Sequence, residues 1–121
     1  MSTDQGWFAA RIILERVFPL DPAAQRLFEE RIVLLRARDD DEAWKKAERA
    51  GRSAGERYSN SAGEPVEWRF TEVLDVQSIL DEEIEDGTEV YYSFLNESEV
   101  VDARRRIESP VLRESALSPG A

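Results

Sequence analysis

One amphipathic helix with a clear start signal restricts the fold of this chain more than any other feature. Asp39 to Asp41 supply an N-cap and acids that favour the positive end of a helix dipole, and Glu42 completes the spacing of a capping box. Positions three and four residues apart then form a stripe: Trp44, Ala47, Gly51, Ala54 and Tyr58. This stripe of small residues predicts a helix that packs closely on a sheet, with Trp44 and Tyr58 at its ends. An earlier end at Gly55 is the alternative.

Two strands are predicted before the helix. Trp7–Phe18 places alternate apolar side chains on one face and a mixture of apolar and charged side chains on the other. A strand that is partly apolar on both faces is typical of a central position. The second strand, Phe28–Ala37, has an apolar centre at Ile32–Leu35. A helix is the alternative there, but the two β-branched residues favour a strand.

Two further strands are predicted after the helix. Pro65–Val76 contains the cleanest alternation of apolar and polar residues in the chain. Asp86 and Gly87 predict a turn, because glycine adopts a positive φ without steric cost. Thr88–Leu95 alternates again and is predicted as the fourth strand. The predicted order of elements is therefore β-β-α-β-β.

This order predicts the α+β class: a two-layer sandwich of a four-stranded antiparallel sheet and one main helix, plus a C-terminal helix. We expect the third strand to cross over and pair with the first, so that the sheet order is 2-1-3-4 with the first strand central. One helix covers one face of the sheet and leaves the other open. On this open face we place the candidate interface residues: Trp7, Arg11, Ile13, Arg31, Val33, Arg69, Glu89 and Tyr91.

The predicted domain is a single unit at residues 7–95, and its flanks have different character. Residues 1–6 are expected to be a flexible N-terminus. Asn96, with Glu99 three residues later, predicts the cap of a last helix at residues 96–107. From Glu108 the chain is rich in Ser, Pro and Gly, which predicts a disordered tail over residues 108–121.

The 121 residues include no histidine and no cysteine, which excludes several kinds of chemistry. An imidazole base, a Ser-His-Asp triad, a disulfide, a thiol nucleophile and a Cys-ligated metal centre all need one of these residues. The N-terminal residues lack the basic region of a signal peptide, and no stretch approaches a membrane span. We therefore expect a cytoplasmic protein.

The net charge of −10 arises from one segment. Residues 70–103 contain no Lys or Arg, whereas the rest of the chain, with 16 basic and 15 acidic residues, is nearly neutral. The eleven acids of this segment are Glu72, Asp75, Asp81, Glu82, Glu83, Glu85, Asp86, Glu89, Glu97, Glu99 and Asp102. Such a segment attracts a basic protein partner and repels nucleic acid and anionic membranes, so neither of these is an expected partner. A solvated, solubility-promoting surface is the alternative.

Two acid clusters are candidates for cation binding or acid–base chemistry. Asp39–Asp41 lack the spacing of an EF-hand loop and precede a helix N-terminus, which repels cations, so we interpret them as a cap. The acids at residues 81–86 lie in a polar loop, whereas acid–base catalysis needs carboxylates in a dry cleft. We interpret this loop as solvated or partner-facing. The sequence therefore predicts no catalytic residue, no metal ligand and no cofactor.

Four short segments, in order, resemble a known family. They are Trp7–Ile12 (WFAARI), Asp40–Ala43 (DDEA), Trp68–Phe70 (WRF) and Asp86–Tyr91 (DGTEVY). Together they resemble a small bacterial family known as domain of unknown function 4288, over roughly Trp7 to Leu95. The resemblance implies a small intracellular bacterial domain with no assigned activity, and it supplies no catalytic residues.

The open sheet face leads to the favoured functional hypothesis. Aromatic residues and arginine are enriched in interfaces, so we expect a non-enzymatic protein-interaction module that forms a homodimer or binds a partner through this face. One alternative is an immunity or inhibitor protein for a basic toxin or nuclease. Another is a small-ligand-binding or carboxylate-based enzyme site formed by Arg11, Arg69 and Glu89. A C-terminal helix that covers the face, or a solvated face, is the remaining interpretation.

Overall fold

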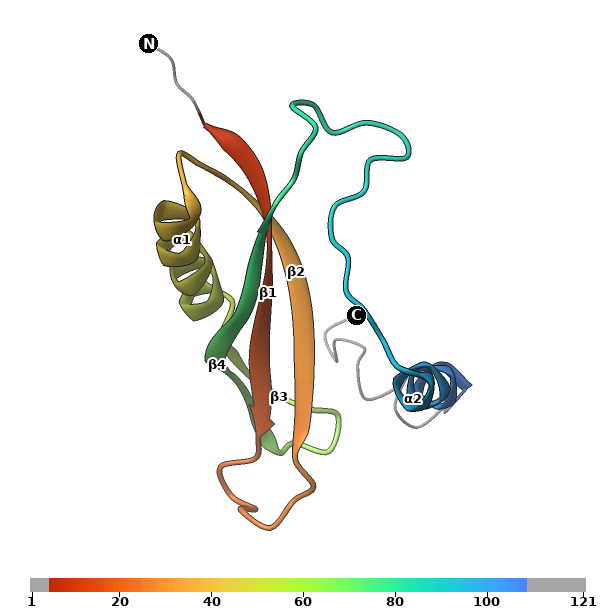
Figure 1. Cartoon of the computed structure of the whole chain (residues 1–121). Helices are drawn as coiled ribbons and strands as arrows, with labels where there is room; N and C mark the ends of the chain where they lie inside the picture. Colours follow the sequence, from red (N-terminus) through yellow and green to blue (C-terminus); the bar gives the residue numbers. More distant parts are fainter. Residues whose placement is uncertain (1–4, 109–121) are drawn as a thin grey trace. The chain divides into compact units, whose positions relative to one another are not determined.

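The computed structural model describes residues 5–108, and the chain divides into two compact units at Tyr91 and Tyr92. The first unit contains a four-stranded antiparallel sheet with one helix packed on it, and the second contains another helix (Figure 1). The elements are β1 (Gly6–Val17), β2 (Leu27–Ala37), α1 (Asp40–Ser53), β3 (Glu56–Ser59), β4 (Pro65–Ser78) and α2 (Glu97–Glu108). The predicted α+β class, with one main helix and a C-terminal helix, is confirmed.

β1 lies at the centre of the sheet, whose strand order is β2-β1-β4-β3. It pairs antiparallel with β2 on one side and with β4 on the other, along nearly its whole length. The central position of the first strand and its antiparallel pairing with the strand after the helix are as predicted. The phase of β1 explains this position, because Ile12 and Leu14 are fully buried on one face while Ala9 is fully buried on the other.

The fourth strand is not the predicted one. The edge of the sheet is formed by β3, which pairs with the first residues of β4, whereas residues 88–95 form no strand. α1 ends at Ser53, so Tyr58 belongs to β3 and not to the end of the helix. A turn begins at Asn60, whose amide donates to the carbonyl oxygen of Glu64 at 2.9 Å. A hairpin this local needs little loop-closure entropy, and it occupies the edge that the later segment was expected to take.

The small residues of α1 allow the helix to approach the sheet closely. Ala47 and Gly51 of the predicted stripe are buried, and Ala43 is buried beside them. A Cβ atom at Gly51 would lie 2.3 Å from ring atoms of Phe70 in β4, so only glycine fits there without a shift. The core beneath the helix consists of Ala10, Ile12, Leu14, Ala47, Trp68 and Val73. Trp44, which was expected to close one end of the stripe, is 40% exposed.

β4 contains two extra residues relative to β1. The pairing shifts between Arg11 and Ile12 and again between Ile13 and Leu14, which leaves Leu74 and Thr71 of β4 without a directly opposite residue. The Thr71 hydroxyl donates to the carbonyl oxygen of Ile13 at 3.2 Å and so helps to hold one of these bulges. Each bulge increases the local twist of the strand. It also shifts the alternation by one residue, so that the residues after it point to the face opposite to the one that strict alternation would give.

The predicted turn and the predicted C-terminal cap are both present. Gly87 has a φ of +89°, and the amide of Thr88 donates to the carbonyl oxygen of Glu85. In the second unit, the Asn96 side chain accepts from the amide of Glu99 at 2.9 Å, and the Glu99 carboxylate accepts from the amide of Asn96 at 3.0 Å. This reciprocal capping box starts α2 at Glu97.

The predicted flanks fall mostly outside the described residues. Residues 1–4 of the expected flexible N-terminus and residues 109–121 of the expected tail are not described, while Gly6 already belongs to β1 and Glu108 to α2. Within residues 5–108, neither helix has the length and hydropathy needed to cross a membrane.

Candidate interaction surface

The sheet has one face that α1 leaves uncovered, which we call the open face. Directly paired residues of an antiparallel ladder point to the same side, so the register assigns each residue to a face. Ile12 and Leu14 lie beneath α1, and their neighbours along β1 therefore point to the open face. The open face comprises Trp7, Ala9, Arg11, Ile13 and Glu15 of β1, Phe28, Glu30, Ile32, Leu34 and Arg36 of β2, and Glu67, Arg69, Glu72, Asp75 and Gln77 of β4.

Two of the predicted interface residues do not lie on the open face. Val33 pairs with Ala10 and Arg31 pairs with Ile12, so both point to the helix side. Val33 packs against the core, and Arg31 forms an ion pair with Glu29 at 2.7 Å. The predicted placement of Arg31 and Val33 on the open face is therefore wrong. Its cause is the run of four apolar residues at 32–35, which shows no alternation and so hides the phase of β2.

The correct phase of β2 exposes a row of apolar side chains that sequence reasoning missed. Phe28, Ile32 and Leu34 are 44%, 49% and 43% exposed. They lie on the outer strand of the sheet, with Glu30 between the first two and Arg36 after the last. The guanidinium carbon of Arg26 lies 5.0 Å from the ring centre of Phe28 at the start of this row.

A polar cluster occupies the middle of the open face. The Tyr91 hydroxyl donates to Oδ2 of Asp75 at 2.7 Å and accepts from Nη1 of Arg11 at 3.3 Å. Nε of Arg11 donates to Oε2 of Glu30, and its guanidinium carbon lies 5.6 Å from the centre of the Tyr91 ring. The cluster therefore joins β2, β1, β4 and the segment after β4 through one chain of charge-assisted hydrogen bonds.

The cluster changes the acid–base properties of its members. The hydrogen bond from Tyr91 lowers the pKa of Asp75, and the amide of Val76 also donates to this carboxylate. Burial raises the pKa of Tyr91, and its hydrogen bond to Asp75 acts in the same direction. The hydrogen bond to Tyr91 raises the pKa of Arg11. All three groups are thus held in their ordinary ionisation states at neutral pH.

Further ion pairs flank the cluster on the same face. Glu15 accepts from Nε of Arg26 at 2.8 Å, and this bond lowers the pKa of Glu15. Glu67 lies between Arg69 at 2.9 Å and Arg57 at 3.3 Å, and the bond from Arg69 lowers the pKa of Glu67. The charges of the open face are therefore largely paired within the sheet.

The remaining predicted interface residues lie on β1, on β4 and in the segment after β4. Trp7 and Ile13 are partly buried on β1, and the guanidinium carbon of Arg36 lies 5.0 Å from the centre of the Trp7 ring. The structure brings Arg11 and Tyr91 together, as described above. Arg69 instead binds Glu67, and Glu89 is exposed in the segment after β4. Arg11 and Arg69 thus bind different carboxylates.

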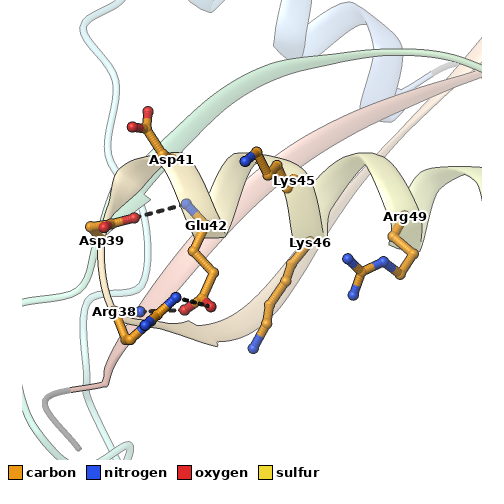
Figure 2. Close-up of a pocket in the computed structure, with 7 residues that line it drawn as sticks. All are labelled: Arg38, Asp39, Asp41, Glu42, Lys45, Lys46 and Arg49. Carbon is orange, nitrogen blue, oxygen red and sulfur yellow. Dashed lines mark hydrogen bonds and ion pairs between the residues drawn. The ribbon is translucent and has the colours of Figure 1, made fainter.

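A depression of about 310 Å³ lies on the outer side of α1, and Figure 2 shows the side chains that line it. The Asp39 carboxylate accepts from the amide of Glu42 at 2.8 Å, which confirms the predicted N-cap. The Glu42 carboxylate accepts from the amide of Arg38 at 2.7 Å, and this bond lowers its pKa. Lys46 donates to the carbonyl oxygen of Arg36 at 2.6 Å. Asp39, Glu42, Arg38 and Lys46 thus hold the start of the helix in place.

The second acid cluster is fully at the surface. Asp81, Glu82, Glu83, Glu85 and Asp86 are all exposed. Within the described part of the chain, no group of three or more acidic side chains is arranged to hold a metal ion.

The comparison with known proteins identifies the family. Residues 7–92 match the model of the family Domain of unknown function (DUF4288). The matched residues include α1 and, apart from Gly6, all four strands. The chain therefore belongs to this family. No curated protein and no solved structure matches the chain.

Proposed function

We propose that this member of the DUF4288 family is a protein-interaction module that binds another polypeptide through its open face. The observation that carries the proposal is the row of Phe28, Ile32 and Leu34, each more than two fifths exposed on an outer strand. Large apolar side chains that are contiguous on a surface favour association, because their burial against a partner removes apolar area from water.

The surroundings of the row support the same function. Interfaces commonly have an apolar centre with a polar rim, and they are enriched in arginine and aromatic residues. The row is bordered by Arg11, Arg36 and Trp7, and Arg11 is already hydrogen-bonded to Tyr91 within the domain. Side chains that are ordered before binding lose less conformational entropy on binding.

Site-specific photo-crosslinking tests this function. A photoreactive amino acid replaces Ile32 on the open face and, as the matched control, exposed Lys45 on the outer side of α1. After irradiation in the native host, we expect a defined polypeptide adduct at position 32 that is absent at position 45. The adduct should be lost when Ile13→Asp is added, because a charge beside the row opposes its burial. Equal adducts at both positions, or none at position 32, contradict the proposal.

A second candidate is the binding of a basic protein, as an immunity or inhibitor protein would bind a toxin or nuclease. It is favoured by the five exposed acids of the loop at residues 81–86. Fixed charges of one sign raise the association rate with an oppositely charged partner. Neutralising these acids to Asn and Gln should then reduce the adduct yield at position 32, and added salt should do the same. A yield unchanged by both treatments excludes this candidate.

A further inference from the structure

The outer edge of β2 differs from the opposite edge of the sheet. In the described residues no strand pairs with the outer side of β2, whose pairing with β1 runs over eleven residue pairs without a shift. The opposite edge is formed by β3, which has four residues, and by the part of β4 that contains both bulges. Short strands and bulges are common protections against edge-to-edge pairing. The β2 edge has neither.

The sequence of β2 also lacks the residues that commonly prevent pairing at an edge strand. Leu27–Ala37 contains no lysine, proline or glycine, the residues that commonly block an edge. It contains two glutamates and two arginines, so β2 is neutral in a chain whose net charge is −10. β2 itself therefore does not repel a second, equally charged molecule.

We propose that β2 pairs antiparallel with β2 of a second copy of this chain, about a two-fold axis at Val33. This inference rests on the proposed function and names a second copy as the partner, which contacts the apolar row where it meets the β2 edge. The two sheets then form one continuous sheet, and the two apolar rows become neighbours on a single open face. The carbonyl oxygen of Arg36 already accepts from Lys46, so the new backbone hydrogen bonds lie within the central stretch Arg31–Leu35.

Side-chain complementarity selects this register. A two-fold axis at Val33 places Ile32 opposite Leu34 of the second copy and Glu30 opposite Arg36 of the second copy, each twice. An axis at Ile32 would instead oppose Glu30 to Leu34, and an axis at Leu34 would oppose Ile32 to Arg36. Apolar pairs and opposite-charge pairs across strands are stabilising. The axis at Val33 provides both on the open face.

The atoms needed for the new ion pair remain accessible. Glu30 binds Arg11 through Oε2, so Oε1 can accept from the second copy. Arg36 lies over the ring of Trp7, and a guanidinium stacked by its face still directs its N–H groups outward in the ring plane. The two ion pairs between the copies therefore form without loss of the contacts within each copy.

Charge reversal tests the proposal by sedimentation. The wild-type chain should dimerise at micromolar concentration. Glu30→Arg alone and Arg36→Glu alone should each weaken the dimer about tenfold, because each creates two like-charge pairs. An equimolar mixture of the two variants should recover wild-type association, because the mixed dimer restores both opposite-charge pairs. This recovery controls for any effect on the single chain, since neither variant alone is repaired within its own molecule.

Disulfide trapping tests the register, because the chain has no cysteine of its own. Residues directly opposite in an antiparallel pair have Cα atoms about 4.5–5.5 Å apart, which suits a disulfide. Chains carrying Ile32→Cys should crosslink to chains carrying Leu34→Cys, and neither should crosslink efficiently alone. Crosslinking of either variant alone overturns the axis at Val33.

A wild-type chain that remains monomeric at 100-fold higher concentration also overturns the inference. If position 32 then still photo-crosslinks to a different polypeptide, the proposed function survives and only the second copy is excluded. If it does not, both fail.

Discussion

The two faces of the sheet differ in how far their apolar side chains are buried. On the helix face, Ile12 and Leu14 are fully buried beneath the small residues of α1. On the open face, Ile32 and Leu34 remain nearly half exposed, and the charged side chains around them are paired with one another. Both faces come from the same strands, and often from adjacent residues.

This difference indicates which face stabilises the fold. Complete burial of a large aliphatic side chain contributes roughly 1.5–3 kcal/mol, whereas a surface ion pair contributes about 0–1 kcal/mol. The helix face therefore supplies most of the stability, and the open face is free to change without loss of the fold. Four predictions test this division.

The largest expected effect separates two isoleucines on neighbouring strands. Ile12→Ala should lower the free energy of unfolding by about 2–5 kcal/mol, because it leaves a cavity in the core. Ile32→Ala should lower it by less than about 1 kcal/mol, because half of this side chain is already in water. Urea unfolding at a concentration where the protein is monomeric measures both. Equal losses would remove the distinction between the faces.

The next effect concerns the distance between α1 and the sheet. Gly51→Ala should destabilise the fold by about 1–3 kcal/mol, although alanine favours a helix, because its Cβ meets the Phe70 ring. Gly6→Ala is the control, since a Cβ there has no atom within 4 Å. A stabilised Gly51→Ala variant would show that the helix can move away from β4 at little cost.

A polar contact on the helix face should have a smaller effect. Nε1 of Trp68, a residue only 7% exposed, donates to the Tyr58 hydroxyl at 3.0 Å. Tyr58→Phe leaves this donor without its acceptor and should cost about 1–2 kcal/mol. A double-mutant cycle with Trp68→Phe isolates the pair. Additive losses in the cycle would show that the hydrogen bond does not contribute.

The smallest effect is expected on the open face and depends on pH. A carboxyl group whose pKa is lower in the folded than in the unfolded state stabilises the fold above its unfolded pKa, and this contribution is lost as the pH falls through the folded pKa. Asp75 is such a group, because Tyr91 donates to it. Tyr91→Phe should therefore raise the pKa of Asp75 toward its unfolded value, so that less stability is lost as the pH falls.

The neutral-pH loss in this variant should be about 0.5–1 kcal/mol. NMR titration of the Asp75 carboxyl measures its pKa directly, and unfolding at a series of pH values measures the stability. Asp75→Asn is the control, and adding Tyr91→Phe to it should leave the pH dependence unchanged. An unchanged pKa of Asp75 in Tyr91→Phe would contradict the role of the phenol.

The elements predicted correctly are those whose local signals agree. The Asp39 cap, the small stripe of α1 and the Asn96–Glu99 capping box each depend on residues three or four apart, which the chain order alone determines. The central position of β1 follows from its apolar residues on both faces. Of the open face, Trp7, Arg11, Ile13 and Arg69 were predicted from the phase of β1 and the first half of β4.

The errors share a different cause, namely register. The apolar run of β2 is compatible with either phase, and the long connection from β1 does not determine which residues pair. Arg31 and Val33 were therefore placed on the wrong face, and Glu30, Ile32 and Leu34 were missed. Asp75 was also missed, although the two bulges before it cancel and leave it in the phase of Glu67 and Arg69. Residues 88–95 alternate like a strand, but a nearer segment, β3, takes the edge of the sheet.

The two bulges of β4 also determine how the strand tolerates changes of length. Each extra residue reverses the inside–outside order of everything that follows, and the second reversal cancels the first. Deleting Thr71 or Leu74 would remove one bulge and leave every later residue on its own side, because neither residue has a directly opposite partner on β1. Deleting a paired residue away from the bulges, such as Val76, would instead turn Gln77 toward the helix. Natural length variation in β4 is therefore expected at positions 71 and 74.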